Sequence, residues 1–299
     1  MRKSTAVVLL IFANLFWAGN YICGKFVIGE MEPIQINFLR WLIAAVILFP
    51  LAQLIERPDW KAIFKEWKLL LVLSILGIIG YNLLLYEALY FTTSLDAALI
   101  NSVNPAMIAI FAVWLLKEKL SKVNVLGLIV SLVGVLLVLT HGNLLHVFAV
   151  DYNVGDLFML VVIISWTFYT LLSNRIKDLP PIGATAVTVA FSVLVMLPFF
   201  MYSNFNWSFT PATATGILYL ALFPSVGSLL FWNIGVPIVG SSHAGIFLNL
   251  ITVFTAILSI LLGNGINLFQ IIGGLVVVLG VYLTNKKPGE KSVHQELNA

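Results

Sequence analysis

The stretch VNVLGLIVSLVGVLLVL, residues 123–139, has a counterpart near the end of the chain, FQIIGGLVVVLGVYL, residues 269–283. In each stretch a carboxamide precedes a glycine by three residues, and a second glycine followed by valine comes seven residues later. Glycines spaced in this way lie about 20° apart around a helix and form one stripe. Because small residues on one stripe let helix backbones approach closely, both stretches are predicted to be packing helices.

The composition is typical of a membrane protein. Of the 299 residues, 61% are hydrophobic and 10% are charged, whereas a soluble domain carries roughly 25% charged residues. Apolar runs of about twenty residues recur along the chain, the length that an α-helix needs to cross a hydrocarbon core of about 30 Å. We therefore expect an all-α integral membrane protein in contact with the lipid bilayer, with no nucleic-acid partner because its lysines lie in short loops beside the membrane.

Proline, glycine and charge clusters divide the chain into ten candidate transmembrane helices. The first is too long for the apolar core of a signal peptide, so we expect it to be retained. The expected limits are residues 5–26, 33–54, 68–89, 94–115, 123–139, 155–174, 181–200, 213–231, 242–262 and 269–283.

The basic residues indicate the orientation of these spans. If the N-terminus is cytoplasmic, every lysine and arginine of a loop or tail falls on the cytoplasmic side, as the positive-inside rule requires. Lys25 and Arg40 are set apart because they lie inside spans. We expect a multi-pass protein of the cell membrane with cytoplasmic N- and C-termini, and a disordered cytoplasmic tail over residues 285–299.

The two glycine stripes belong to a longer internal repeat. The first half spans residues 5–139 and the second spans residues 155–284, with an outer loop over residues 140–154 between them. Because each half contains five helices, an odd number, the second half enters the membrane from the opposite side and the halves are inverted repeats. Further matches in nearly constant register are Pro33 with Pro181, Pro50 with Pro198, Trp17 with Trp166, and Gly80 with Gly227.

Two longer stretches carry a family resemblance. EKLSKVNVLGLIVSLVGV, residues 118–135, and WNIGVPIVGSSHAGIFLNLITVF, residues 232–254, resemble the EamA-type permeases of the drug/metabolite transporter superfamily, and the similarity covers about residues 5–285. The resemblance implies ten helices in two inverted halves, a central cavity lined by the first four helices of each half, and movement of small metabolites, often outward. The chain departs from the family pattern at Thr252, where proline is usual, and at Asn264 or Gly265, where the first half has Glu118.

Four ionisable residues, Arg40, Glu87, Asp96 and His243, lie within or at the ends of spans. A charge near the centre of a span costs about 2.5–3.5 kcal/mol on insertion scales and tends to face the bundle interior. Arg40 is a candidate to bind an anionic substrate group, or to form a structural pair with an acid such as Glu87. Glu87, Asp96 and His243 are candidates for proton coupling, with solvation at the boundary or hydrogen bonding at a helix start as the alternative.

Neutral polar and aromatic side chains form stripes on the first four helices of each half and are nearly absent from the fifth. This division predicts a polar cavity ringed by eight helices, although each residue taken singly could instead hydrogen-bond between helices. The candidate substrate-binding residues are Asn14, Trp17, Tyr21, Arg40, Asn82, Tyr86, Asn101, Asn104, Trp166, Thr170 and Trp232.

These features predict a secondary transporter of small polar or amphipathic metabolites, amino acids or related compounds, which works by alternating access, exports its substrate and is a candidate for proton coupling. A lipid-linked sugar flippase or a passive channel of the same architecture is the alternative. We expect no enzyme, cofactor or metal site, since the sequence contains no catalytic constellation or metal-ligand spacing. The expected partners are a small-molecule substrate and a second copy of the chain in a homodimer.

One motif does not carry the chemistry that its spacing suggests. GNYICGKF, residues 19–26, fits the spacing of a phosphate-binding loop. It lies inside an apolar helix, no strand precedes it, and Phe26 replaces the Ser or Thr that would bind Mg²⁺. We therefore expect no nucleotide site.

Overall fold

A computed structural model describes residues 2–92, 94–118, 120–140, 142–143, 153–205, 208–263 and 268–285 of the protein. Over these residues the chain forms helices and no strand. Seven of the helices are long and apolar enough to cross a membrane. The expected all-α fold with helices of membrane length is thus confirmed.

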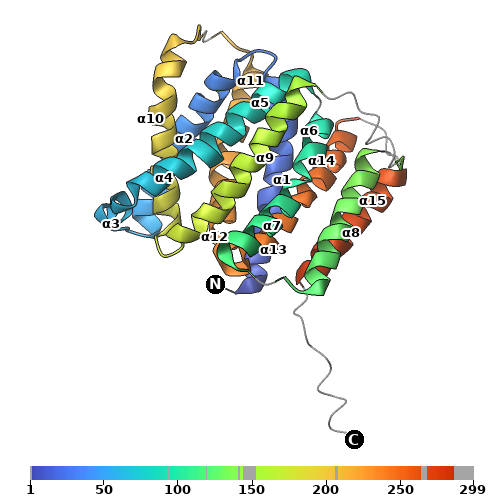
Figure 1. Cartoon of the computed structure of the whole chain (residues 1–299). Coiled ribbons are helices and arrows are strands. Elements are labelled where there is room, and N and C mark those ends of the chain that lie inside the picture. Colours follow the sequence, from blue (N-terminus) through green and yellow to red (C-terminus); the bar gives the residue numbers. More distant parts are fainter. Residues whose placement is uncertain are drawn as a thin grey trace, which may run out of the picture.

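The helices follow one another as rods, several of which are interrupted (Figure 1). Up to residue 140 they are α1 (Lys3–Val27), α2 (Pro33–Ile55), α3 (Trp60–Lys65), α4 (Trp67–Leu73), η1 (Ser74–Gly80), α5 (Tyr81–Phe91), α6 (Ser94–Asn101), α7 (Asn104–Leu116) and α8 (Lys122–Leu139). After residue 152 they are α9 (Val154–Ser173), η3 (Asn174–Ile176), α10 (Pro181–Tyr202), α11 (Pro211–Leu220), η4 (Ala221–Ser228), α12 (Leu229–Val239), α13 (Ser241–Ile246), α14 (Asn249–Leu261) and α15 (Leu268–Asn285).

Two rods contain a π-helical turn, η1 between α4 and α5 and η4 between α11 and α12. A π turn contains one residue more than an α turn and frequently marks a functional site. In η4 the hydroxyl of Ser225 donates to the backbone carbonyl of Leu220, five residues earlier, at 2.8 Å. The π turns bring Gly77 and Ser225 to the centre of the bundle, as described below.

Helices α8 and α15, which contain the two glycine stripes, run side by side along one edge of the bundle (Figure 1). A Cβ atom on Gly134 would lie 2.6 Å from the backbone nitrogen of Val277 and 2.7 Å from the carbonyl oxygen of Gly273. On the facing helix, a Cβ atom on Gly280 would lie 2.5 Å from the backbone nitrogen of Ser131. The stripes therefore pack against each other, and the prediction of packing helices is confirmed.

The remaining helices surround α1, which packs against η4, α12 and α14 from the later part of the chain, while α2 packs along α10. Helix α15 extends to Asn285, the first residue of the tail expected from the sequence. Residues 286–299 of that tail, and most of the expected loop over residues 140–154, lie outside the described residues.

Three carboxylates from the first part of the chain bind the starts of later helices. Glu56 accepts hydrogen bonds from the backbone N–H groups of Ile182 and Gly183 at the start of α10, at 2.9 and 2.8 Å. Glu118 does the same at the start of α13, and Glu30 accepts from the backbone N–H and hydroxyl of Thr210 before α11, at 3.0 and 2.9 Å. A carboxylate at a helix start binds otherwise unpaired N–H groups and the positive end of the helix dipole, so each contact ties the two parts together.

Candidate functional site

Arg40 of α2 lies at the centre of a buried hydrogen-bond network and is only 1% exposed. Its Nε donates to the hydroxyl of Ser225 at 2.7 Å. Its Nη1 donates to the Oδ1 atoms of Asn20 at 2.8 Å and Asn82 at 3.4 Å, and to the hydroxyl of Tyr86. The Tyr86 hydroxyl in turn donates to Asn20 Oδ1 at 2.7 Å. The network therefore joins α1, α2, α5 and η4 around one cation.

The partners of this cation are neutral. Arg40 Cζ also lies 5.0 Å from the ring centroid of Trp41 and 5.7 Å from that of Tyr86, so aromatic rings supply part of its electrostatic compensation. Among the described residues no carboxylate contacts Arg40, and the pair with Glu87 left open by the sequence is not formed. A guanidinium remains charged in a protein, and a buried charge without a counterion favours an anionic ligand.

Beside Arg40 three tryptophans predicted from separate helices come together. The ring centroids of Trp17 and Trp166 are 5.1 Å apart, those of Trp17 and Trp232 are 5.4 Å apart, and those of Trp166 and Trp232 are 5.6 Å apart. The rings of Tyr81 and Tyr169 each lie 4.9 Å from Trp166. We call these five residues the aromatic cluster.

A small central cavity lies between Arg40 and the aromatic cluster. Its space is about 10 Å³, which is enough for about one water molecule. The site is thus closed around its charged group in this conformation. The cavity is lined by Trp17, Arg40, Trp41, Gly77, Tyr81, Asn82, Trp166, Pro224 and Leu229.

Several buried donors around this cavity have no hydrogen-bond partner among the described residues: the indole nitrogens of Trp41, Trp166 and Trp232 and the hydroxyl of Thr170. An indole N–H can only donate. Because Trp41 and Trp166 line the central cavity beside Arg40, the cavity offers a positive charge and N–H groups to a ligand. This arrangement suits a ligand group that accepts hydrogen bonds, such as a carboxylate.

Other predicted site residues lie elsewhere. Asn14 donates to the carbonyl of Leu10 in its own helix at 2.6 Å. Asn104 donates to Asn101 at 3.4 Å and accepts from Thr167 at 3.2 Å, so the two asparagines form a separate cluster at the break between α6 and α7. These three asparagines do not line the central cavity. Tyr21 joins its edge by a hydrogen bond between its hydroxyl and that of Tyr81, at 3.2 Å.

The candidate coupling residues are also spread apart. Glu87 lines a lateral pocket that contains Glu32 and apolar side chains of η1 and α10. His243 lies in α13 and is half-buried, but Glu118 rather than His243 accepts the N–H groups at the start of that helix. The side chain of Asp96 lies outside the described residues. Over the described part of the chain, no three His, Cys, Asp or Glu side chains group as metal ligands would.

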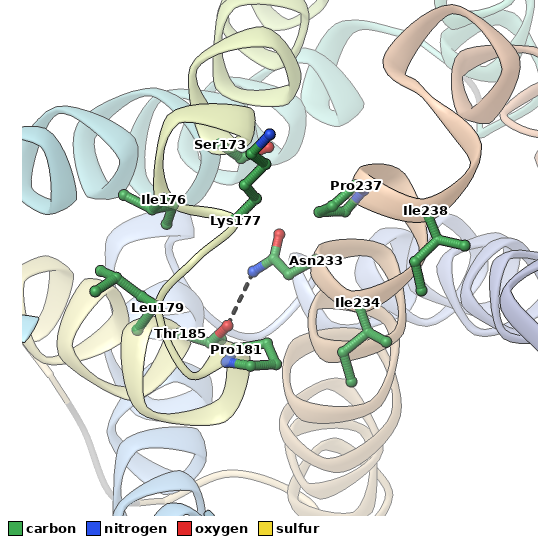
Figure 2. Close-up of a pocket in the computed structure, with 11 residues that line it drawn as sticks. Ser173, Ile176, Lys177, Leu179, Pro181, Thr185, Asn233, Ile234, Pro237 and Ile238 are labelled. Atoms are coloured by element: carbon green, nitrogen blue, oxygen red, sulfur yellow. Dashed lines mark hydrogen bonds between the residues drawn. The ribbon is translucent and has the colours of Figure 1, made fainter. Parts of the chain in front are cut away.

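A second and larger pocket opens between the end of α9, the start of α10 and α12 (Figure 2). We call it the vestibule; its volume is about 210 Å³. Its polar side chains are Ser173, Lys177, Thr185 and Asn233, and Asn233 Nδ2 donates to Thr185 Oγ1 at 2.9 Å (Figure 2). The rest of its lining is apolar.

Sequence reasoning missed several residues of this region, among them Asn20, Tyr81, Tyr169, Ser225 and Asn233. Tyr169 follows Trp166 by three residues and therefore shares its helix face, a signal that was available. Ser225 was not accessible in this way, because the π turn of η4 places it opposite Arg40.

Comparison with known proteins gives the family. The profile of the EamA-like transporter family matches residues 4–140 and again residues 153–286. The uncharacterized transporter YyaM of Bacillus subtilis is 30% identical over 285 residues, which cover 94% of this chain and 93% of YyaM. An uncharacterized transporter of Archaeoglobus fulgidus is 28% identical over 289 residues, covering 95% of this chain and 99% of the relative.

The fold also has a solved counterpart. One crystal structure superposes with a TM-score of 0.76 at 18% sequence identity, covering 95% of this chain and 97% of the other. At that identity the likeness concerns the fold alone. On the family profile and the full-length relatives together, the chain belongs to the EamA-like transporter family, whose members are membrane transporters.

Proposed function

We propose that this protein is a secondary transporter of small metabolites that carry a carboxylate, amino acids or related compounds, and that Arg40 binds the carboxylate. The observation that carries the proposal is the burial of Arg40 among neutral partners beside unpaired indole N–H groups. A carboxylate in the central cavity would accept from both the guanidinium and the indoles. The aromatic cluster would contact the apolar part of the substrate.

The proposed architecture is two inverted halves of five spans each, with both termini in the cytoplasm of the cell and the cavity between the halves. Two observations support it: the family profile matches two stretches of similar length, and the π turns η1 and η4 occupy corresponding rods. Alternating access would then be a rocking of one half against the other. Export is the proposed direction, on the family resemblance.

Coupling to protons is proposed through Glu87. It lies in the span Trp67–Phe91, its pocket is largely apolar, and the other carboxylate in that pocket is Glu32. Two neighbouring carboxylates in an apolar groove favour protonation of one of them. Glu87→Gln should therefore abolish the dependence of transport on a pH gradient while exchange without a gradient continues.

Counterflow in proteoliposomes tests the proposed function. Vesicles loaded with an unlabelled amino-acid mixture should transiently accumulate a labelled amino acid when the wild-type protein is present. Arg40→Gln should lower the initial rate by about tenfold or more, because hydrogen bonds to charged groups contribute about 1.5–3 kcal/mol. The matched control is Arg175→Gln, which removes an exposed arginine at the end of α9.

The outcomes separate the alternatives. Wild-type flux that never saturates and shows no counterflow would indicate a passive channel. Wild-type counterflow that Arg40→Gln leaves unchanged would refute binding at Arg40. Because Arg40 holds four side chains together, the melting temperature of each variant in detergent is measured in parallel, and Arg40→Lys, which keeps the charge but not the planar fork, should give an intermediate rate.

A further inference from the structure

The vestibule and the central cavity have separate linings, and one side chain lies between them. The vestibule ends at Asn233 and Thr185 (Figure 2), while the central cavity is bounded by Trp166 and Gly77, among others. Tyr169, which lines neither cavity, contacts the walls of both.

Three contacts place Tyr169 in this position. Its hydroxyl donates to Asn233 Oδ1 at 2.7 Å, on the vestibule side. Its ring stacks on that of Trp166, with centroids 4.9 Å apart and an interplanar angle of 24°, on the central side. Its ring also covers Gly77, since a Cβ atom on that glycine would lie 2.2 Å from Tyr169 Cδ2. The side chain is 2% exposed and therefore fills the space between the two cavities.

The partition between the cavities thus consists of one aromatic ring from α9 resting on the backbone of η1. Gly77 has no side chain that could hold the ring from the opposite helix, and one hydrogen bond, to Asn233, fixes its hydroxyl. A rotation of the Tyr169 side chain away from Asn233 would join the two cavities without any movement of the backbone.

We propose that Tyr169 is the gate between the vestibule and the central cavity, that Asn233 holds it closed, and that the vestibule is the substrate's route to Arg40. The inference rests on the proposed function in one respect: it takes the central cavity to be the place where substrate binds. A carboxylate that enters the vestibule is a stronger acceptor than the amide oxygen of Asn233. It would take over the hydrogen bond of the Tyr169 hydroxyl and release the ring, so that the anionic group itself opens the gate.

The gate is tested by the accessibility of a cysteine in the central cavity. Leu229 lines that cavity and is 2% exposed. In a Cys23→Ser background, which removes the single native cysteine, Leu229→Cys provides the target for a small, water-soluble methanethiosulfonate reagent. The rate of labelling in detergent micelles reports how often the cavity opens, whether or not the protein transports anything.

Two substitutions at Tyr169 grade the effect. Tyr169→Phe removes the hydrogen bond to Asn233 and keeps the ring, so labelling should become several-fold faster. Tyr169→Ala removes the partition and should accelerate labelling on the order of tenfold or more. Addition of glycine or another small amino acid should accelerate labelling of the Tyr169 protein and should change that of the Tyr169→Phe protein little.

Tyr219 provides the matched control. It is also a partly buried tyrosine whose hydroxyl donates to a neighbouring helix, to the carbonyl of Phe16 at 3.2 Å, and whose ring covers a glycine, Gly19. It lines neither of the two cavities. Tyr219→Phe and Tyr219→Ala should therefore label at the rate of the parent, which separates opening of the gate from a general loosening of the bundle.

The outcomes decide the inference. Labelling rates in Tyr169→Phe and Tyr169→Ala equal to that of the parent would overturn it, as would an equal acceleration by Tyr219→Ala. Faster labelling confined to the Tyr169 variants, together with wild-type protein that shows no counterflow of carboxylates, would support the gate and refute the proposed substrate. The two claims therefore fail separately.

Discussion

Glu118 caps the start of α13 by accepting a hydrogen bond from the backbone N–H of Ser241 at 3.0 Å. A second bond, 3.1 Å long, comes from the N–H of Ser242 to the other carboxylate oxygen. Glu118 follows α7, whereas α13 begins more than a hundred residues later, so a single carboxylate joins the two parts of the chain at one end of the bundle. Glu56 forms the equivalent contact with the start of α10.

Loss of this cap should destabilise the fold. Glu118→Gln keeps the shape of the side chain but removes the charge and one of its two acceptors, which should cost about 0.5–2 kcal/mol. A lower melting temperature in detergent would reveal the change. The matched control is Glu66→Gln, since Glu66 stands at the start of α4 without a capping side-chain hydrogen bond. Equal stability of the two variants would contradict the assigned role of Glu118.

The contact between α8 and α15 should be intolerant of even a methyl group. Gly134→Ala would place Cβ within 2.7 Å of two backbone atoms of α15, which cannot move aside as a side-chain tip can, and we expect a loss of about 1–3 kcal/mol. On the same pair of helices, Gly274→Ala would meet only Val253 Cγ1 at 3.6 Å and should be tolerated. Thermal unfolding in detergent compares the two, and an unaffected Gly134→Ala protein would refute the close approach.

Glu30 should make stability depend on pH at the opposite end of the bundle. Hydrogen bonds from the backbone N–H and the hydroxyl of Thr210 hold the pKa of the Glu30 carboxyl below its usual 4.5. A group whose pKa is lower in the folded state stabilises the fold above the unfolded value, and this contribution disappears as the pH falls through the folded value.

Melting temperatures at neutral and acidic pH measure this effect. The wild-type protein should melt higher than Glu30→Gln at pH 7, and the difference should shrink once the pH is well below about 4.5. A difference between the two proteins that stays constant over this range would contradict the assignment.

Trp166 should contribute more to substrate binding than to stability. Its buried indole nitrogen has no hydrogen-bond partner among the described residues, and an unpaired buried donor costs about 1–3 kcal/mol. Trp166→Phe keeps most of the ring and removes this donor, so the melting temperature should stay level or rise while the concentration for half-maximal transport of a carboxylate increases. As a control, Trp60→Phe removes the indole that donates to Gln53 at 3.1 Å, far from the cavity in α3. A Trp166→Phe protein with unchanged transport would show that the indole N–H does not meet the substrate.

The sequence predicted much of the fold because composition and apolar run length directly reflect the requirements of a bilayer. The glycine stripes were equally informative, since Gly134 and Gly280 pack as their spacing indicated. The breaks between α6 and α7 and between α13 and α14 were not foreseen. Apolar residues continue through both breaks, and hydropathy does not distinguish a kinked helix from a straight one.

For the candidate site, helical spacing predicted which face each residue occupies but not which helix that face meets. Arg40, Asn82 and Tyr86 do meet, and so do Trp17, Trp166 and Trp232. Asn101 and Asn104 share a face as expected, yet that face meets α9 through Thr167 instead of the central cavity. Such pairings depend on helix crossing and on local π turns, which a single sequence does not specify.

The central claim is that two five-helix halves cross the membrane in opposite senses around the Arg40 cavity. It is tested most directly by labelling single cysteines with a membrane-impermeant maleimide in intact cells, using Asn143→Cys between the halves and Glu290→Cys in the tail, each in a Cys23→Ser background. We predict that Asn143→Cys reacts in intact cells and that Glu290→Cys reacts only after the cells are broken. Reaction of both cysteines from the same side would contradict the inverted halves and the transport mechanism built on them.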